Sequence, residues 1–318
     1  MTRNLLGIRH LDVETIQNLI SLGRTFKAKV TSGEKIEPMS DQVVGLLFFE
    51  NSTRTRVSFE QAAFYLGLKC SNFAAAGSSI SKGETLRDTI LTLRHERLNG
   101  LVMRHRSSGS AQLAAGYFGG PVINAGDGSH EHPTQALGDA LTIVERKGTL
   151  DGLVVAIVGD VEHSRVARSN AWLLSKMGAE VRFVGPRTML PSHVSMLPGT
   201  LYHEMPAGLE GADVVMALRL QRERMGEGMV SSIDEFTRNY QVNREKLRFA
   251  KPDCLVMHPG PINRGIELDD ISADGDHSVI HQQIENGIFV RMAALHWAFG
   301  GGAIKQAETK KSGKKVKA

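Results

Sequence analysis

Short apolar runs alternate with helical patterns along most of this chain of 318 residues. The apolar run at 43–49 ("VVGLLFF") precedes helical spacing from Thr53 to Leu66, and the same order recurs at 153–160 and 164–177. Alternation of strands and helices predicts parallel sheets that are covered by helices on both faces. We therefore expect an α/β protein with two doubly wound parallel-sheet domains joined by long helices.

The remaining elements follow from the same spacing rules. Strands are expected at 100–105, 121–126, 180–186, 212–218 and 253–259, helices at 11–29, 83–98, 109–118, 132–146 and 286–301, and irregular structure at 219–240. The strand–helix pattern starts afresh after the helix at 132–146, which places the domain boundary in or near that helix. We assign 1–135 and 286–303 to the first domain, 136–285 to the second domain and 304–318 to a disordered basic tail.

The positive charge of the chain is concentrated in this tail. The whole sequence carries a formal charge of +4, and the segment from Lys305 to Ala318 holds six lysines against one acid, Glu308. The other residues therefore sum to about −1. The tail has almost no apolar residues, which predicts a solvated, disordered segment. The net charge is thus no reason to expect a protein body that binds nucleic acid.

Cysteine content and the N-terminus indicate the compartment. Cys70 and Cys254 are too few for a disulfide framework, and no zinc-ligand spacing is present in the sequence. We expect no metal or other cofactor, and a location in the reducing cytoplasm. Charges interrupt residues 1–20 every few positions, so neither a signal peptide nor a membrane-spanning helix is expected there.

Polar residues gather where the predicted strands end, which is where ligands bind in sheets of this kind. The stretch "ENSTRTR" (50–56) joins a buried strand to a helix N-terminus, whose free N–H groups attract anions. Ser52, Thr53 and Thr55 can donate hydroxyl hydrogen bonds, and Arg54 can hold two oxygens at once. A helix N-cap with solvent-facing arginines would explain part of this stretch, but the whole cluster predicts a site for phosphate or another compact anion.

Two other basic residues near this cluster are weaker candidates. Arg56 is expected to belong to the scaffold, paired with Glu50 or Glu60. Lys82 lies in a Gly- and Ser-rich segment at 74–89, which predicts a loop that carries a cation. Surface loops of this composition are common, so the segment alone does not indicate a site.

The link at 124–137 ("NAGDGSHEHPTQAL") presents His132 and Gln135 at the start of a long helix. A helix N-terminus lowers the pKa of an imidazole and favours its neutral form, which can donate one hydrogen bond to a carbonyl oxygen. A single histidine is nevertheless more often structural than catalytic. Arg104 closes an earlier apolar strand, where it is either exposed at the end of the sheet or placed against a ligand.

The second domain carries clusters of its own. Arg165 and Arg219 follow two predicted strands, and Gln221 comes shortly after the second of them. The G-x-G-x-x-G fingerprint of dinucleotide binding is missing here, whereas two arginines at two strand ends favour a dicarboxylate. Two prolines stiffen "MHPGPINRG" (257–265), whose backbone carbonyls can accept hydrogen bonds from an –NH₂ group.

Seven of these segments, in this order and spacing, resemble the catalytic chains of the aspartate carbamoyltransferase family. They are "STRTR", "SKGET", "VMRH", "HPTQ", "VGD…SR", "LRLQRER" and "HPGPINRG", and the resemblance spans about residues 5–300. It implies transfer of the carbamoyl group of carbamoyl phosphate to the amino group of L-aspartate, in pyrimidine biosynthesis. It also implies a homotrimer with shared active sites.

The resemblance implies a role for each candidate residue. The phosphate would be bound by Ser52, Thr53, Arg54 and Thr55, and the carbamoyl oxygen by Thr55, Arg104 and His132. The carbamoyl –NH₂ would be bound by Gln135 and by the backbone of Gly260 and Pro261. The carboxylates of aspartate would be bound by Arg165, Arg219 and Gln221. Lys82, with Ser79 in preference to Ser81, would reach the site from a neighbouring subunit and also bind aspartate. Gly260 stands where the family often has leucine, which should matter little because the contact is the backbone carbonyl.

The chemistry of this reaction agrees with these residue types. Attack of a neutral amine on the carbonyl carbon gives an oxyanion, which preorganised donors stabilise by about 3–4 kcal/mol each. Positioning of the two substrates lowers the barrier by about 7–11 kcal/mol. No side chain is an evident base for the amine, so we expect the departing phosphate to accept its proton. The reaction requires neither a covalent nucleophile nor a metal.

Other functions are weighed against this one. An ornithine carbamoyltransferase shares the "STRTR" site, but its cationic acceptor conflicts with Arg219, Arg222 and Arg224 near the acceptor pocket. A non-catalytic phosphate-binding homologue would not need the whole set of site residues, and a nucleic-acid-binding function rests on the tail alone. The sequence leaves open whether regulatory or dihydroorotase-like chains bind this one, and whether nucleotides regulate it.

Overall fold

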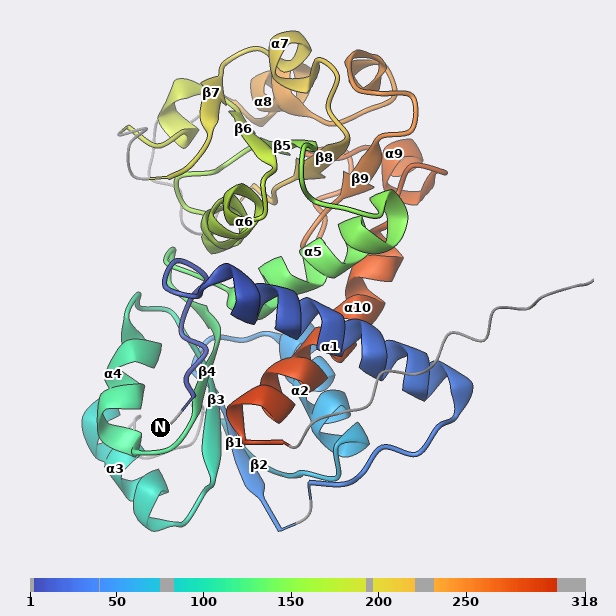
Figure 1. The fold of residues 1–318 in the computed structure, drawn as a ribbon. Helices are drawn as coiled ribbons and strands as arrows, with labels where there is room; N and C mark the ends of the chain where they lie inside the picture. The colour runs from blue at the N-terminus through green and yellow to red at the C-terminus, as the bar shows by residue number, and fades with distance from the viewer. Residues whose placement is uncertain (1–2, 40, 75–82, 193–196, 221–231, 302–318) are drawn as a thin grey trace, which may run out of the picture.

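The computed structural model describes residues 3–39, 41–74, 83–192, 197–220 and 232–301, which form two parallel sheets (Figure 1). The first sheet has the strand order β2-β1-β3-β4. Its strands are β1 (Val43–Phe48), β2 (Lys69–Ala74), β3 (Gly100–His105) and β4 (Val122–Asp127), and its helices include α1 (Val13–Ser32), α2 (Thr53–Tyr65), α3 (Leu86–His95) and α4 (Ser110–Phe118). Leu46 of β1 packs into the cluster formed with α1 and α2, whereas Leu47 packs with α3 and α4. Helices therefore cover both faces of this sheet.

The second sheet has the strand order β7-β6-β5-β8-β9. Its strands are β5 (Val154–Val158), β6 (Glu180–Val184), β7 (Thr200–Tyr202), β8 (Val214–Ala217) and β9 (Leu255–Met257), and its helices include α6 (Arg165–Lys176), α7 (Met205–Leu209), α8 (Ile233–Tyr240) and α9 (Asp270–Asp274). Neighbouring strands pair in parallel throughout both sheets.

Each sheet contains one point at which the strand order reverses. In the first sheet β2 and β3 lie on opposite sides of β1, and in the second sheet β6 and β8 lie on opposite sides of β5. A crevice opens beyond the carboxyl ends of the strands at such a point, and ligands bind there. The ends of β1 and β3, and of β5 and β8, are therefore the places where a site is expected.

Two long helices connect the sheets. α5 (Pro133–Lys147) leads from β4 to β5, and α10 (Ile280–Ala298) leads back from the second domain and packs against α1, α2 and α5 (Figure 1). Pro133 lies in the first turn of α5, and Gly148 ends this helix in the left-handed conformation. A single cluster of buried apolar side chains includes residues of both sheets and of both connecting helices. The packing of these helices therefore holds the two domains together.

The predicted fold class is confirmed, with corrections in particular segments. Residues 219–240, expected to be irregular, include α8, whose first turn is capped by the Ser232 hydroxyl accepting from the Glu235 N–H. The last helix begins at Ile280, six positions before the predicted start. The strands β2 and β7 are absent from the prediction, because β2 (KCSNFA) contains several polar residues and β7 is only three residues long.

Further predictions concern the domain boundaries, the C-terminal tail, the cysteines and membrane-spanning helices. The residue boundaries assigned to the two domains stay a prediction, and the tail at 304–318 lies outside the described residues. Cys70 and Cys254 are both free thiols. Within the described ranges, no helix has the length and apolar character that crossing a bilayer requires.

The packing of α10 predicts unequal costs for two truncations on this helix. Leu295 is fully buried, whereas Ile284 is 54% exposed. Leu295→Ala should lower the free energy of unfolding by about 2–5 kcal/mol, because it leaves a cavity in the shared core. Ile284→Ala should lower it by less than about 1 kcal/mol. Urea denaturation followed by circular dichroism measures both values, and equal losses would contradict the packing of α10.

Candidate active site

One pocket of about 1130 Å³ lies where the two domains meet. Its walls come from the segments that follow β1, β3, β5 and β8, from the first turns of α2, α5 and α6, and from α10. The predicted site residues that line it are Ser52, Thr53, Arg54, Thr55, Arg104, His132, Gln135, Arg165, Arg219, Gly260 and Pro261. Folding thus brings residues from both domains into one site at the switch points of both sheets.

The turn after β1 forms one wall of the pocket. Ser52 Oγ donates to Thr55 Oγ1 over 3.0 Å, and Thr55 is buried in the first turn of α2. Burial, together with the positive charge of Arg219, lowers the pKa of Arg54. Arg54 also lies against Gly260, where an added Cβ would be 3.3 Å from the guanidinium carbon. Arg54 of the first domain therefore faces groups of the second domain.

Glu50 links the two domains by ion pairs. Its Oε1 accepts from Arg104 Nη2 at 2.8 Å and from Arg165 Nη2 at 2.6 Å. Arg104 closes β3 with a side chain that is 11% exposed, so it points into the pocket and not into bulk solvent. Arg56 Nε lies 4.0 Å from Glu60 Oε1, which agrees with the scaffold role predicted for Arg56. Glu50 itself belongs to the pocket, a placement that the sequence analysis missed.

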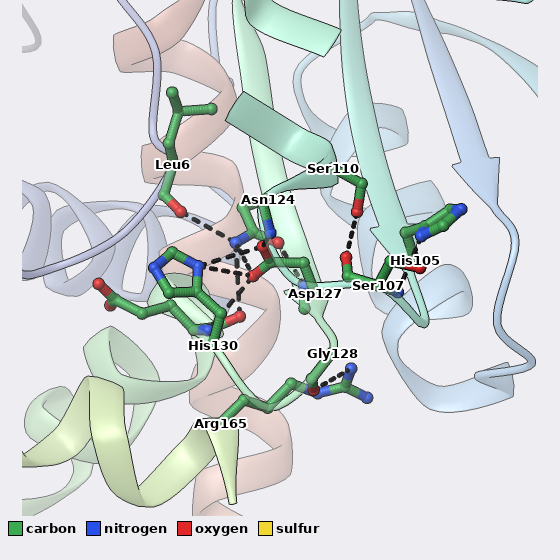
Figure 2. A network of polar contacts seen from close by, with 12 residues as sticks. Leu6, His105, Ser107, Ser110, Asn124, Asp127, Gly128, His130 and Arg165 are labelled. Carbon is green, nitrogen blue, oxygen red and sulfur yellow. Dashed lines mark hydrogen bonds and ion pairs between the residues drawn. The ribbon is translucent and has the colours of Figure 1, made fainter. Parts of the chain in front are cut away.

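A compact polar network shapes the link from β4 to α5 (Figure 2). Asp127 accepts a hydrogen bond from the Asn124 side chain at 2.7 Å, and its carboxylate lies 3.1 Å from His130 Nδ1. The same turn presents the carbonyl of Gly128, which accepts from Arg165 Nη1 at 3.2 Å (Figure 2). This network therefore gives the Arg165 guanidinium a second anchor besides the ion pair described above.

His132 lies at the N-terminus of α5 and is 4% exposed. Its backbone N–H donates to Ser169 Oγ at 2.8 Å, and its Nδ1 has no hydrogen-bond partner among the described residues. Burial, together with Arg104, Arg291 and Arg165, holds the pKa of His132 well below its usual range. The imidazole is therefore neutral at pH 7, as predicted, and burial is the largest of these causes.

Positive charge exceeds negative charge in the pocket. Six arginines line it, namely Arg54, Arg104, Arg106, Arg165, Arg219 and Arg291, and Glu50 is the one carboxylate on its described walls. Cations that are withdrawn from water are costly unless anions approach them. The pocket is therefore built to hold several negative charges at once.

Arg291 is a candidate residue that the sequence analysis missed. It is 5% exposed, and its guanidinium carbon lies 5.4 Å from the centre of the Phe59 ring. Burial lowers the pKa of Arg291 to about 10, which leaves it charged at neutral pH. The available signal was a lone arginine within an apolar helix, because a buried charge needs a partner or a ligand. Gln283 and His258 also line the pocket without having been predicted.

The other predicted site residues lie outside the part of the chain that the structure describes. They are Ser79, Ser81, Lys82, Gln221, Arg222 and Arg224. The roles assigned to them, including the contribution of Lys82 to a neighbouring subunit, stay predictions.

Two family models match this chain. The carbamoyl-P binding domain of aspartate/ornithine carbamoyltransferase matches residues 3–145, and the Asp/Orn binding domain of the same enzymes matches residues 151–298. The chain belongs to the aspartate/ornithine carbamoyltransferase family. It is 52% identical to the aspartate carbamoyltransferase catalytic subunit of Rhodospirillum rubrum over 92% of both chains. It is 51% identical to that of Acidiphilium cryptum, over 92% of this chain and 95% of the relative. The predicted family resemblance is confirmed.

Solved carbamoyltransferases of both acceptor types share this fold. Aspartate transcarbamoylase from Trypanosoma cruzi, in complex with carbamoyl phosphate and aspartate, matches with a TM-score of 0.84 and 32% identity over 95% of this chain and 97% of that chain. Ornithine carbamoyltransferase from Pyrococcus furiosus matches with a TM-score of 0.85 and 30% identity over 95% and 98%. The fold alone therefore does not decide between the two acceptors.

The buried His132 predicts part of the acid sensitivity of this carbamoyltransferase fold. Because its pKa is lowered on folding, the unfolded chain binds a proton below about pH 6.5 that the folded chain does not bind. The stability that this group contributes is complete above that pH and is lost as the pH falls. Between pH 7.5 and pH 5.5 the loss should be on the order of 1 kcal/mol.

A His132→Asn variant should lack this part of the loss. Its free energy of unfolding should therefore fall less than that of the wild type between the same two pH values, when both are measured by urea denaturation. Parallel profiles of the two proteins would show that His132 titrates normally in the folded state.

Proposed function

We propose that this protein transfers the carbamoyl group of carbamoyl phosphate to the amino group of L-aspartate, which gives N-carbamoyl-L-aspartate and phosphate, a step of pyrimidine biosynthesis. The observation that carries this proposal is the excess of arginines over carboxylates in the pocket. A phosphate and two carboxylates supply the negative charge that such a pocket requires. Ornithine would instead add a cation.

The relatives favour the same acceptor. The curated relatives at 50–52% identity are named as catalytic subunits of aspartate carbamoyltransferase. The enzyme from Trypanosoma cruzi, at 32% identity, has been solved with carbamoyl phosphate and aspartate and also with N-(phosphonacetyl)-L-aspartate. Identity to these curated aspartate enzymes is thus well above the 30% shared with the ornithine enzyme from Pyrococcus furiosus.

The phosphate of the donor is assigned to the first turn of α2. Ser52, Thr53, Arg54 and Thr55 line the pocket at the N-terminus of α2. The free N–H groups of such a terminus and the hydroxyl groups can donate to the phosphate oxygens. These groups stabilise the dianion that leaves. Arg54 can bind two phosphate oxygens in parallel, which fixes the direction in which the leaving group departs.

The carbamoyl oxygen is assigned to Thr55, Arg104 and His132. All three line the pocket, and the neutral His132 can donate a hydrogen bond without giving up a proton. As the amine attacks, negative charge develops on this oxygen, and donors that are already in place stabilise it by about 3 kcal/mol each. Glu50 holds the Arg104 guanidinium at 2.8 Å, so this donor needs little reorganisation.

The acceptor is assigned to the second domain. Arg165, fixed by Glu50 and by the carbonyl of Gly128, and Arg219 would bind the two carboxylates of aspartate, with Gln221 as an additional donor. The neutral amine then attacks the carbamoyl carbon, the bond to phosphate breaks, and the phosphate accepts the proton of the amine.

The assembly and location are also part of the proposal. A homotrimer in which Lys82 of one subunit completes the site of its neighbour would add a further cation near both substrates. The two free cysteines favour a reducing compartment, which agrees with the cytoplasm as the place of the reaction. Neither the sequence nor the pocket residues indicate whether regulatory or dihydroorotase-like chains bind to this trimer.

An initial-rate assay tests the function. The purified protein should form N-carbamoyl-L-aspartate and phosphate in equal amounts, with a kcat/KM for L-ornithine that is lower by at least about 100-fold. Arg54→Ala should lower kcat by about 100- to 1000-fold. Arg56→Ala is the matched control, because Arg56 is exposed on the same helix, and it should stay within about threefold of the wild type. Faster carbamoylation of ornithine would refute the assignment.

Subunit mixing tests the shared site. Arg54→Ala and Lys82→Ala chains should each be nearly inactive, and their hybrids should recover activity, because some interfaces then carry both wild-type residues. Hybrids that form, as shown by native mass spectrometry, but stay inactive would mean that Lys82 does not act across an interface.

A further inference from the structure

We propose that Asp139 is a positioning residue that orients the two hydrogen-bond acceptors for the carbamoyl –NH₂ group. Asp139 lies on α5, one helical turn after Gln135, and it is 0% exposed. The inference rests on the proposed function, because it concerns the group that distinguishes carbamoyl phosphate from other acyl phosphates.

Three side-chain amides from three helices converge on this carboxylate. Gln135 Nε2 donates to Oδ1 at 2.8 Å, Gln283 Nε2 donates to Oδ1 at 2.9 Å, and Asn170 Nδ2 donates to Oδ2 at 2.8 Å. Because a carboxylate oxygen accepts hydrogen bonds, each amide must turn its –NH₂ end toward Asp139. Asn170 does so although its own Oδ1 is left buried without a partner among the described residues.

The first consequence concerns Gln135, which lines the pocket. An amide side chain can donate through its nitrogen or accept through its oxygen. Since Nε2 is engaged with Asp139, Oε1 is the atom that Gln135 keeps for a ligand. Asp139 therefore makes Gln135 an acceptor, which suits an –NH₂ group and leaves a methyl group in the same place without a partner.

The second consequence concerns the backbone around Gly260, which Gln283 and His258 hold in place. Because Gln283 turns its Nε2 to Asp139, its Oε1 faces the opposite way and accepts from the His258 backbone N–H at 3.0 Å. His258 Nδ1 in turn accepts from the Gly260 N–H at 2.8 Å, so the ring proton is on Nε2, which lies 3.2 Å from Glu267 Oε1. This relay fixes the backbone whose carbonyls are the second set of acceptors.

A single substitution separates this role from simple packing. Asp139→Leu keeps a branched side chain of similar size but removes both acceptor oxygens. Gln135 and Gln283, which both donate to Oδ1, then have no acceptor at this position, so nothing keeps their –NH₂ ends turned away from the –NH₂ site and from His258. The change disturbs the acceptors of the –NH₂ site without removing any residue from the pocket wall.

The experiment uses two hydrolysis-resistant ligands that differ at the group in question. Phosphonoacetamide carries –NH₂ where acetonylphosphonate carries –CH₃. Calorimetric titration of the full-length protein gives the ratio of their two dissociation constants. The wild type should bind phosphonoacetamide at least about tenfold more tightly, and Asp139→Leu should reduce this ratio to within about twofold. The dissociation constant of acetonylphosphonate should change by less than about threefold.

Thr142→Val is the matched control. Thr142 is buried on the same helix and accepts from Asn286 Nδ2 at 3.0 Å, and it does not line the pocket. This variant should lower the thermal midpoint but keep the wild-type ratio. A wild-type ratio in Asp139→Leu, or an equal fall of the ratio in Thr142→Val, would overturn the inference.

A second variant covers the case in which Asp139→Leu does not fold. Gln283→Met breaks the relay to His258 but leaves Gln135 bonded to Asp139, so the ratio should fall by about threefold. An unchanged ratio would overturn the inference. Carbamoylation of L-aspartate by the wild type is measured with the same preparations. If that activity is present while the variants keep the ratio, the proposed function stands and the role of Asp139 does not.

Discussion

Arginine side chains of both domains face one pocket, and their mutual repulsion is the constraint on which the rest of the structure depends. Burial lowers the pKa of Arg54, with Arg219 adding to the effect, and burial lowers the pKa of Arg291. These shifts reflect the cost of withdrawing a guanidinium from water and, for Arg54, the repulsion by Arg219. Glu50 offsets part of them by pairing with Arg104 and with an arginine of the other domain. The remaining positive charge is available for anionic substrates.

The two connecting helices keep the arginines of both domains close together in the pocket. α5 and α10 pack on each other and share a buried core with both sheets, so the strand ends cannot separate to relieve the repulsion. The same helices carry polar side chains at their contact, with Asp139 at the centre of three amides. The structure thus uses one pair of helices both to hold cationic groups of the two domains together and to orient the neutral acceptors beside them.

Most strands and helices and several site residues could be predicted from the sequence, because the patterns that indicate them are local. The apolar strands and the polar clusters that follow them are contiguous, so "ENSTRTR" and the start of α5 could be placed at the carboxyl ends of strands. Asp139, Gln283 and Arg291 could not be assigned in this way, because their roles arise from contacts between distant segments. Asp139 and Gln283, for example, are 144 positions apart. The strand β2 was missed because polar residues interrupt its apolar pattern, and β7 because it has only three residues.

The central claim is that one pocket holds a phosphate and two carboxylates at the same time. Calorimetric titration with N-(phosphonacetyl)-L-aspartate, compared with the corresponding L-ornithine compound, tests this claim most directly. The pocket should bind the aspartate compound at least about 100-fold more tightly, and the advantage should shrink as the salt concentration rises. Equal or tighter binding of the ornithine compound would contradict the account.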